Sequence, residues 1–437
     1  MRIGLIEFLL ILAIASLTVG PRVALFVDRW MRRANRANAM AARRRAEYAA
    51  QMAAERDAML KRFRTASTVF GVGILLVLVY ALGFRPIDTP PQIYKAPDLR
   101  QETSAMQTAV STDRKTQLEL GEYQGVDCIR AKDGLLYAAA WNGAALKKRT
   151  SDLVRTDGGH AAAILSVEGE LTGFAFDAAG DVWLTQLTTA GGTLCRAKHD
   201  SWGAAVEQVV TQLDGAPLGA VSAVEVSPAG KVYFAVAAAA GAENGLESAL
   251  RTELLAHTGT GAVYVYDPAA RTVEQVVGGI AGASGLALDE HTQTLYISDL
   301  GSRCIWSAAA SARSLTAGGK GCQSSFSGLP GYPGALALDE DSTLYISYRW
   351  ASSSWLERHA GSTFLRGVAL RLSESMQENL FSLPADGIRA EAVSTASGSW
   401  LWSFSGKPQG SSSALCPVEN RVYFGIAGEK ALYSVRV

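Results

Sequence analysis

The sequence predicts an all-β six-bladed β-propeller, preceded by an α-helical membrane anchor with two transmembrane helices. The main observation is a recurring hairpin, clearest in residues 283–299 (ASGLALDEHTQTLYISD), where apolar residues alternate on both sides of a polar turn. Residues 334–347 (GALALDEDSTLYIS) nearly repeat it. Weaker copies bring the number to six: residues 125–138, 173–185, 222–235 and 421–425. Most copies lie about 50 residues apart, a spacing typical of propeller blades.

Two long apolar runs precede the hairpins and predict the two membrane spans. Residues 1–20 contain IGLIEFLLILAIASLTVG, whose 18 residues would span about 27 Å as a helix, and its one acidic residue, Glu7, lies near one end. Residues 67–84 (STVFGVGILLVLVYALGF) carry no charge and are the second predicted span. A cleaved signal peptide is the alternative for the first run. Signal peptides begin with a positively charged region, and here Arg2 is its only basic residue.

Residues 21–66, between the two runs, predict a basic amphipathic cytoplasmic helix. Between Arg22 and Arg64 there are twelve Lys and Arg residues but only four Asp and Glu residues. Short segments dense in positive charge stay in the cytoplasm, so both termini are expected on the extracytoplasmic side of the plasma membrane. The helix would bind anionic lipid at roughly 1 kcal/mol per charge near the surface. A solvated loop that only sets topology is the alternative.

The rest of the chain divides into a stalk and the propeller. Residues 85–117 carry four prolines and predict an extended stalk whose last residues pair with the final blade. Residues 118–437 make up the propeller, with helical insertions expected at 243–257 and 350–371. The formal net charge of zero argues against a nucleic-acid partner, which would require a basic surface.

The five cysteines show no metal-binding spacing. A disulfide between Cys304 and Cys322 is one interpretation, and another is closure of the ring by Cys128 and Cys416. Buried free thiols are the third.

The propeller segments resemble the strictosidine synthase-like family, which includes adipocyte plasma membrane-associated proteins, and more distantly the gluconolactonase and paraoxonase propellers. The resemblance is carried by TGTGAVYVYDPAARTVEQVVGGIAGASGLALDEHTQTLYISD, GLPGYPGALALDEDSTLYIS, the WLxxxxGSTFLRGVALRL insertion and the closing VYFGIAGEKALYSV. It covers about 300 residues. An NHL-type array is the alternative, because its hairpins have a similar pattern.

The resemblance implies a site in the central channel, where hydrolytic relatives hold calcium with Asn and Asp or Glu side chains. Asp299 matches the family's metal-binding aspartate, and Asp127 matches a carboxylate of the first blade. The two asparagines correspond to Ser222 and Ser284. These four are the candidate binding residues at the channel mouth. Asp299 is the only good metal ligand among them, so the calcium site looks depleted.

The resemblance also implies that catalytic groups are missing, and we assign no catalytic residue. Thr172 stands at the position of the paraoxonase-type histidine. The acid that serves strictosidine synthase in its last blade falls near Ser413.

The N-terminus resembles twin-arginine translocase pore subunits. The pattern IGxxExLLxxxIxxLxxGP begins at Ile3 and ends at Pro21. In that family a short membrane helix, a Gly-Pro hinge and an amphipathic helix follow one another. The family has no second span and no exported domain, unlike this chain.

Three functions remain open. The first is a membrane-anchored binding or scaffold module for a small molecule, peptide or glycan, without the family's chemistry. The second is a calcium-dependent lactonase or esterase. The third is an accessory protein of twin-arginine-type export.

Overall fold

The computed structural model describes residues 6, 9–10, 42–100, 116–142, 150–157, 160–203, 206–380, 388–406 and 412–437. The chain divides into two compact units. One comprises residues 1–88 with 367–377, and the other comprises residues 89–366 with 378–437. The described residues include almost none of the first predicted span, residues 1–20. They also exclude residues 21–41 of the predicted basic helix.

The first unit contains one long helix. Helix α2 (Ala42–Val79) continues into a π-helical turn, η1 (Tyr80–Phe84), without a break between the predicted basic helix and the predicted second span. Within the described part of the chain, one helix, Gln51–Phe84, is long and apolar enough to cross a membrane by length and composition. The sequence predicted an anchor of two transmembrane helices, and the described residues contain one candidate for such a helix.

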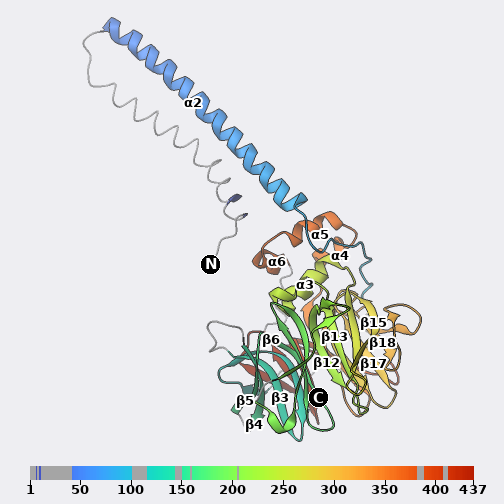
Figure 1. The fold of residues 1–437 in the computed structure, drawn as a ribbon. Coiled ribbons are helices and arrows are strands. Elements are labelled where there is room, and N and C mark those ends of the chain that lie inside the picture. Colours follow the sequence, from blue (N-terminus) through green and yellow to red (C-terminus); the bar gives the residue numbers. More distant parts are fainter. Residues whose placement is uncertain are drawn as a thin grey trace. The chain divides into compact units, whose positions relative to one another are not determined.

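The second unit is the predicted six-bladed propeller (Figure 1). Blades 1 and 2 are sheets of four consecutive antiparallel strands, and blade 3 adds a fifth strand to the same arrangement. Blade 1 consists of β2 (Tyr123–Lys132), β3 (Leu135–Asn142), β4 (Thr150–Asp157) and β5 (His160–Glu168). Blade 2 consists of β6 (Glu170–Phe176), β7 (Val182–Thr188), β8 (Gly191–Ala197) and β9 (Glu207–Val210). Blade 3 consists of β12 (Ala220–Val226), β13 (Val232–Ala238), β14 (Gly261–Asp267), β15 (Thr272–Ile280) and β19 (Leu315–Thr316), the last of which pairs with β15 in parallel.

The last three blades follow the same plan. Blade 4 consists of β16 (Ala283–Asp289), β17 (Thr294–Asp299), β18 (Cys304–Ala309) and β20 (Cys322–Phe326). Blade 5 consists of β21 (Gly331–Leu338), β22 (Thr343–Ala351), β23 (Ile388–Ser394) and β24 (Trp400–Gly406). Blade 6 consists of β25 (Ser412–Val418), β26 (Arg421–Ile426), β27 (Ala431–Arg436) and β1 (Thr116–Glu119).

Short elements connect or extend the blades. They are a small hairpin of β10 (Gln212–Leu213) and β11 (Ala216–Pro217), the 3₁₀ turns η3 (His199–Ser201) and η4 (Ala242–Asn244), and the helices α3 (Leu246–Ala256), α4 (Ser354–Arg358), α5 (Thr363–Leu370) and α6 (Glu374–Leu380). The helices α3, α4 and α5 fall in the two insertions that broke the strand pattern. Both insertions connect the second strand of a blade to its third.

The ring closes by pairing strands from opposite ends of the propeller. Strand β1 pairs antiparallel with β27, and Leu118 lies opposite Leu432. The prediction that the end of the stalk pairs with the final blade is confirmed. Because β1 comes from the N-terminal side of the unit, the last blade is completed by the first strand.

Aspartates at the inner turns explain why the repeated sequence forms hairpins. The Asp339 carboxylate accepts hydrogen bonds from the backbone N–H groups of Asp341 and Thr343, at 3.0 and 2.8 Å. Asp177 does the same for Ala179 and Asp181, at 2.9 and 3.0 Å. An aspartate that satisfies backbone donors two and four residues later fixes a tight turn. The turn then sets the register of the strands on either side.

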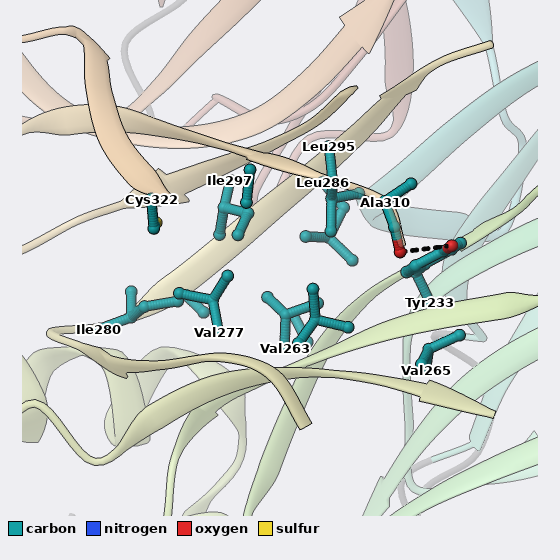
Figure 2. Packing of buried hydrophobic residues seen from close by; sticks show 14 residues of the cluster. Tyr233, Val263, Val265, Val277, Ile280, Leu286, Leu295, Ile297, Ala310 and Cys322 are labelled. Carbon is teal, nitrogen blue, oxygen red and sulfur yellow. Dashed lines mark hydrogen bonds between the residues drawn. The ribbon is translucent and has the colours of Figure 1, made fainter. Parts of the chain in front are cut away.

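Adjacent blades pack through apolar side chains. Figure 2 shows the cluster between blades 3 and 4, where Val263 and Val277 face Leu286 and Ile297. The Tyr233 hydroxyl at its edge donates to the carbonyl of Ala310 at 3.0 Å. Burial on both faces of each sheet is the reason for the continuous apolar runs in these strands.

Near the ring axis, glycines let the inner strands approach one another. A Cβ added at Gly285 would lie 2.3 Å from the carbonyl oxygen of Gly334 on the next blade. We expect Gly285→Ala to lower the free energy of unfolding by roughly 1–3 kcal/mol, because the inner strands of blades 4 and 5 must move apart. Urea denaturation measures this loss. Gly361→Ala is the matched control, since a Cβ there meets nothing within 4 Å; equal effects of the two changes would contradict the prediction.

All five cysteines are buried free thiols. The two predicted disulfides, Cys304 with Cys322 and Cys128 with Cys416, are not formed, and the third interpretation describes these residues. Burial raises the pKa of Cys195 and of Cys416 to about 12, which keeps both thiols protonated near neutral pH.

Residues 89–100 of the predicted stalk lie against the propeller, and we call this segment the strap. The backbone N–H of Gln92 donates to the carbonyl of Ala256 at 2.7 Å, and that of Arg100 donates to Gly328 at 2.8 Å. The Arg303 guanidinium donates to the Pro97 carbonyl at 3.0 Å. These bonds satisfy backbone groups that a free linker would leave to water, and the strap is part of the propeller unit.

Candidate functional site

The candidate site is the central channel, where the six inner strands converge. Each inner strand carries a β-bulge, seen as a shift of register with its neighbour. The extra residues that these bulges leave without a paired partner on the neighbouring strand are Asp127, Thr172, Ser222, Ser284, the pair Gly334 and Ala335, and Ser413. A bulge turns a side chain out of the regular alternation, and all of these residues except Gly334 line one cavity on the axis.

The structure brings three of the four predicted site residues together and places the fourth elsewhere. Asp127, Ser222 and Ser284 line the cavity. Asp299 is not among the lining residues, and its carboxylate accepts hydrogen bonds from the Ser302 N–H at 3.0 Å and from the Trp306 indole N–H at 2.9 Å. Burial raises the pKa of Asp299, and these hydrogen bonds oppose the rise. Its observed role is to hold the turn that follows β17.

The bulge serines join neighbouring blades. The Ser222 hydroxyl donates to the Ala283 carbonyl at 2.6 Å, and the Ser284 hydroxyl donates to the Pro333 carbonyl at 2.8 Å. Ser413 donates to the Val126 carbonyl at 2.5 Å and joins the last blade to the first. In each case the acceptor is the residue just before the next blade's bulge. These hydroxyls therefore have a structural role around the ring.

A buried arginine projects into the channel from the second strand of blade 5. Arg349 on β22 is 5% exposed, and its guanidinium lies 3.9 Å from the Asp127 carboxylate. Gly334 lies beside it, and a Cβ on that glycine would lie 3.4 Å from the Cβ of Arg349 and 3.2 Å from the Ser347 hydroxyl. The Nε of Arg349 has no hydrogen-bond partner within the described residues. A buried guanidinium in this state requires water or another acceptor beside it.

A second ion pair crosses the ring further along the inner strands. Arg130 on β2 pairs with Glu225 on β12, which connects blade 1 to blade 3. Burial raises the pKa of the Glu225 carboxyl, and the Arg130 charge opposes that rise. Both residues lie three positions after a bulge residue, so the pair closes the channel beyond the ring of hydroxyls.

The two ion pairs leave very little space. The cavity has a volume of about 20 Å³. One water molecule needs roughly 10–15 Å³ by the same measure, whereas sites for small organic ligands measure roughly 300–1,000 Å³. In this conformation that cavity can hold water but not a lactone or an ester.

The residues present do not fit a calcium ion. Calcium takes six to eight oxygen ligands, several of them carboxylates. Asp127 is the one carboxylate among the lining residues, and the Arg349 cation lies beside it. Within the described residues, no three His, Cys, Asp or Glu side chains are placed to hold a metal ion.

The resemblance-based positions for catalytic groups also lie at the channel. Thr172 donates to Thr185 of its own blade, with 2.9 Å between the two hydroxyl oxygens. Ser413 is one of the inter-blade serines. Neither position carries a group that transfers protons near neutral pH. Sequence analysis missed Arg349, Arg130 and Glu225, because their meeting depends on the bulges and on ring closure.

Comparisons with known proteins agree with the fold. Residues 194–355, which are 162 of the 437 in the chain, match the family model described as "SMP-30/Gluconolactonase/LRE-like region". This stretch is SMP-30/gluconolactonase-like. None of the curated proteins gives a match.

Several solved structures are similar to this chain at low identity. A luciferin-regenerating enzyme is 15% identical, with a TM-score of 0.51, and the match covers 74% of this chain and 95% of that one. A gluconolactonase from Xanthomonas campestris is 15% identical, with a TM-score of 0.48 and coverage of 81% and 99%. A calcium-binding regucalcin from Agrobacterium tumefaciens is 12% identical, with a TM-score of 0.45 and coverage of 73% and 90%.

Proposed function

We propose that this SMP-30/gluconolactonase-like propeller is a membrane-anchored interaction module whose channel no longer performs hydrolysis. The observation that carries the proposal is the axial cavity of about 20 Å³ with Arg349 beside its single lining carboxylate, Asp127. A resident guanidinium there supplies positive charge without the open coordination positions that a catalytic metal needs. Binding of a small molecule, peptide or glycan would then use the outer surface of the propeller.

Membrane anchoring is part of this proposal. It is supported by the apolar helix Gln51–Phe84 and by the arginine-rich sequence before it. We propose that the arginine-rich segment stays in the cytoplasm and that the propeller lies outside the plasma membrane. In sealed right-side-out vesicles, external protease should digest the propeller and spare residues 21–66. The opposite pattern of protection would reverse this topology.

The finer family assignment remains our proposal as well. Within the gluconolactonase-like propellers we place this chain with the strictosidine synthase-like group, on the LPGYPG turn and the insertion that forms α4 and α5. A role in twin-arginine-type export stays a prediction from residues 3–21. Co-purification of translocase subunits with the full chain, but not with a chain lacking residues 1–66, would support it.

The second candidate function is a calcium-dependent lactonase or esterase, which the family match over residues 194–355 favours. Turnover of lactone and aryl-ester substrates by the full chain in detergent separates the two functions. We expect rates equal to those of buffer, with calcium or with a chelator. Calcium-dependent turnover that is lost in Asp127→Ala or Asp299→Ala would overturn the proposal.

Arg349 provides a sharper test of why calcium is excluded. The triple variant Arg349→Gln, Ser222→Asn, Ser284→Asn removes the cation and restores two amide oxygens. We expect calcium at ten times the dissociation constant to stabilise this variant by about 1.4 kcal/mol, measured as a calcium-dependent rise in the unfolding midpoint. The double variant Ser222→Asn, Ser284→Asn retains Arg349 and should show no rise, as should the wild type. A calcium-dependent rise in the wild type would contradict the assignment of Arg349.

A further inference from the structure

Exposed apolar side chains of the propeller unit gather at the strap. In the described part of this unit, large apolar side chains are exposed at six positions: Ile93, Leu99, Phe364, Leu365, Leu401 and Val437. Four of the six lie on the strap or at the start of α5, and three of these lie where the strap and α5 are joined by hydrogen bonds. We call Ile93, Phe364 and Leu365 the apolar patch. They are 73%, 57% and 40% exposed.

One buried arginine holds the patch together. Arg366 follows Phe364 and Leu365 on α5, and it donates to the carbonyl of Gln92, the residue before Ile93. It also donates to the Ala360 carbonyl at 3.0 Å, and Ala360 in turn accepts from the Tyr94 N–H at 3.4 Å. The strap and the first turn of α5 therefore lie side by side, and their polar backbone groups are satisfied inward. The apolar side chains on either side are left facing solvent.

The sequence indicates what covers this patch. The apolar helix ends at Phe84, and eight residues later Gln92 is hydrogen-bonded to the propeller. Eight extended residues reach at most about 29 Å. If Gln51–Phe84 crosses a bilayer, the tether keeps the patch within that reach of the lipid surface. Aromatic and aliphatic side chains on an amphipathic surface partition into the boundary between headgroups and acyl chains.

We propose that Ile93, Phe364 and Leu365 dock the propeller onto the surface of the bilayer in which the chain is anchored. The inference rests on the anchoring proposed above. Its partner is the lipid itself, and no second protein is needed. The docked state orients the propeller so that the inner hairpin turns, at the other end of the strands, face away from the membrane.

Site-specific fluorescence on the full chain tests this docking. The five described cysteines are buried, so a thiol-reactive, environment-sensitive probe will label an introduced cysteine. We would place it in Phe364→Cys or Ile93→Cys, with Glu340→Cys as the control. Glu340 is exposed in the turn between β21 and β22. This turn lies at one end of β22, and α4 follows the other end of that strand. Each labelled chain is reconstituted in lipid nanodiscs with and without a spin-labelled phospholipid quencher.

We expect the quencher to reduce emission several-fold at positions 364 and 93 and to leave position 340 unchanged. A second variant adds Phe364→Asp and Leu365→Asp to the chain labelled at position 93, and its quenching should fall to the level of position 340. If the chain enters nanodiscs and position 364 behaves like position 340, the docking is wrong while the anchoring stands. If the full chain does not associate with lipid at all, both are wrong.

Discussion

Replacing Arg366 with alanine is expected to lower the free energy of unfolding by roughly 3–5 kcal/mol. Arg366 is fully buried, and its guanidinium donates to four backbone carbonyls, those of Leu255, Ala256, Gln92 and Ala360. A hydrogen bond to a charged group contributes roughly 1.5–3 kcal/mol, and each carbonyl left buried without a donor adds a penalty. Urea denaturation of the full chain in detergent measures the loss.

The loss of stability in Arg366→Ala should be largest at the strap. Hydrogen exchange of the amides of Gln92 and Tyr94 should accelerate more than exchange in the blades, because both amides pair with the segments that Arg366 holds. Arg358→Ala is the control, since Arg358 is exposed and bonds only to its own helix, at Ser354, among the described contacts. A loss below about 1 kcal/mol for Arg366→Ala, with unchanged strap amides, would contradict this role.

Acidification from pH 6.5 to 4 should remove roughly 3 kcal/mol of stability through His257. The His257 ring stacks on Tyr94 with 3.8 Å between ring centres. Burial first, and then the nearby Arg366 charge, lower the pKa of His257 from 6.5 to about 4. The unfolded chain therefore takes up a proton in this range while the folded chain does not. Stability is fully present above pH 6.5 and falls as the pH drops toward 4.

His257→Asn isolates this effect from the carboxyl groups that titrate over the same range. His257 ends α3 in a left-handed conformation, with φ +52°, which asparagine tolerates well. The difference in unfolding free energy between the wild type and this variant should shrink as the pH falls. His291→Asn, at an exposed position, should leave the wild-type pH dependence unchanged. Parallel curves for the wild type and His257→Asn would show that His257 does not control this dependence.

The repeating parts of the fold could be predicted, because local chemistry determines them. Alternation and an aspartate-capped turn are properties of about 15 consecutive residues, as in residues 334–347, so they are visible in the sequence. The pairing of β1 with the last blade was also predicted. The strap was not, because its contacts with Ala256, Arg303 and Arg366 depend on segments more than 150 residues away.

The channel could be predicted only in part. Asp127, Ser222 and Ser284 occupy equivalent bulge positions, so a family pattern could point to them, and they line the axial cavity. Arg349 was missed because it enters from a second strand, next to the two-residue bulge of the inner strand. The Arg130–Glu225 pair was missed because its partners are 95 residues apart.

The pairing of β1 with β27 has a consequence for biogenesis. Five blades can fold from consecutive sequence as the chain emerges, but the sixth needs residues 431–436, which are synthesised more than 300 residues after the strand they pair with. Until then Thr116–Glu119 has an unpaired edge, which can pair with another chain. A chain truncated before residue 431 would thus leave the last blade open and prone to aggregate, although its other five blades are present.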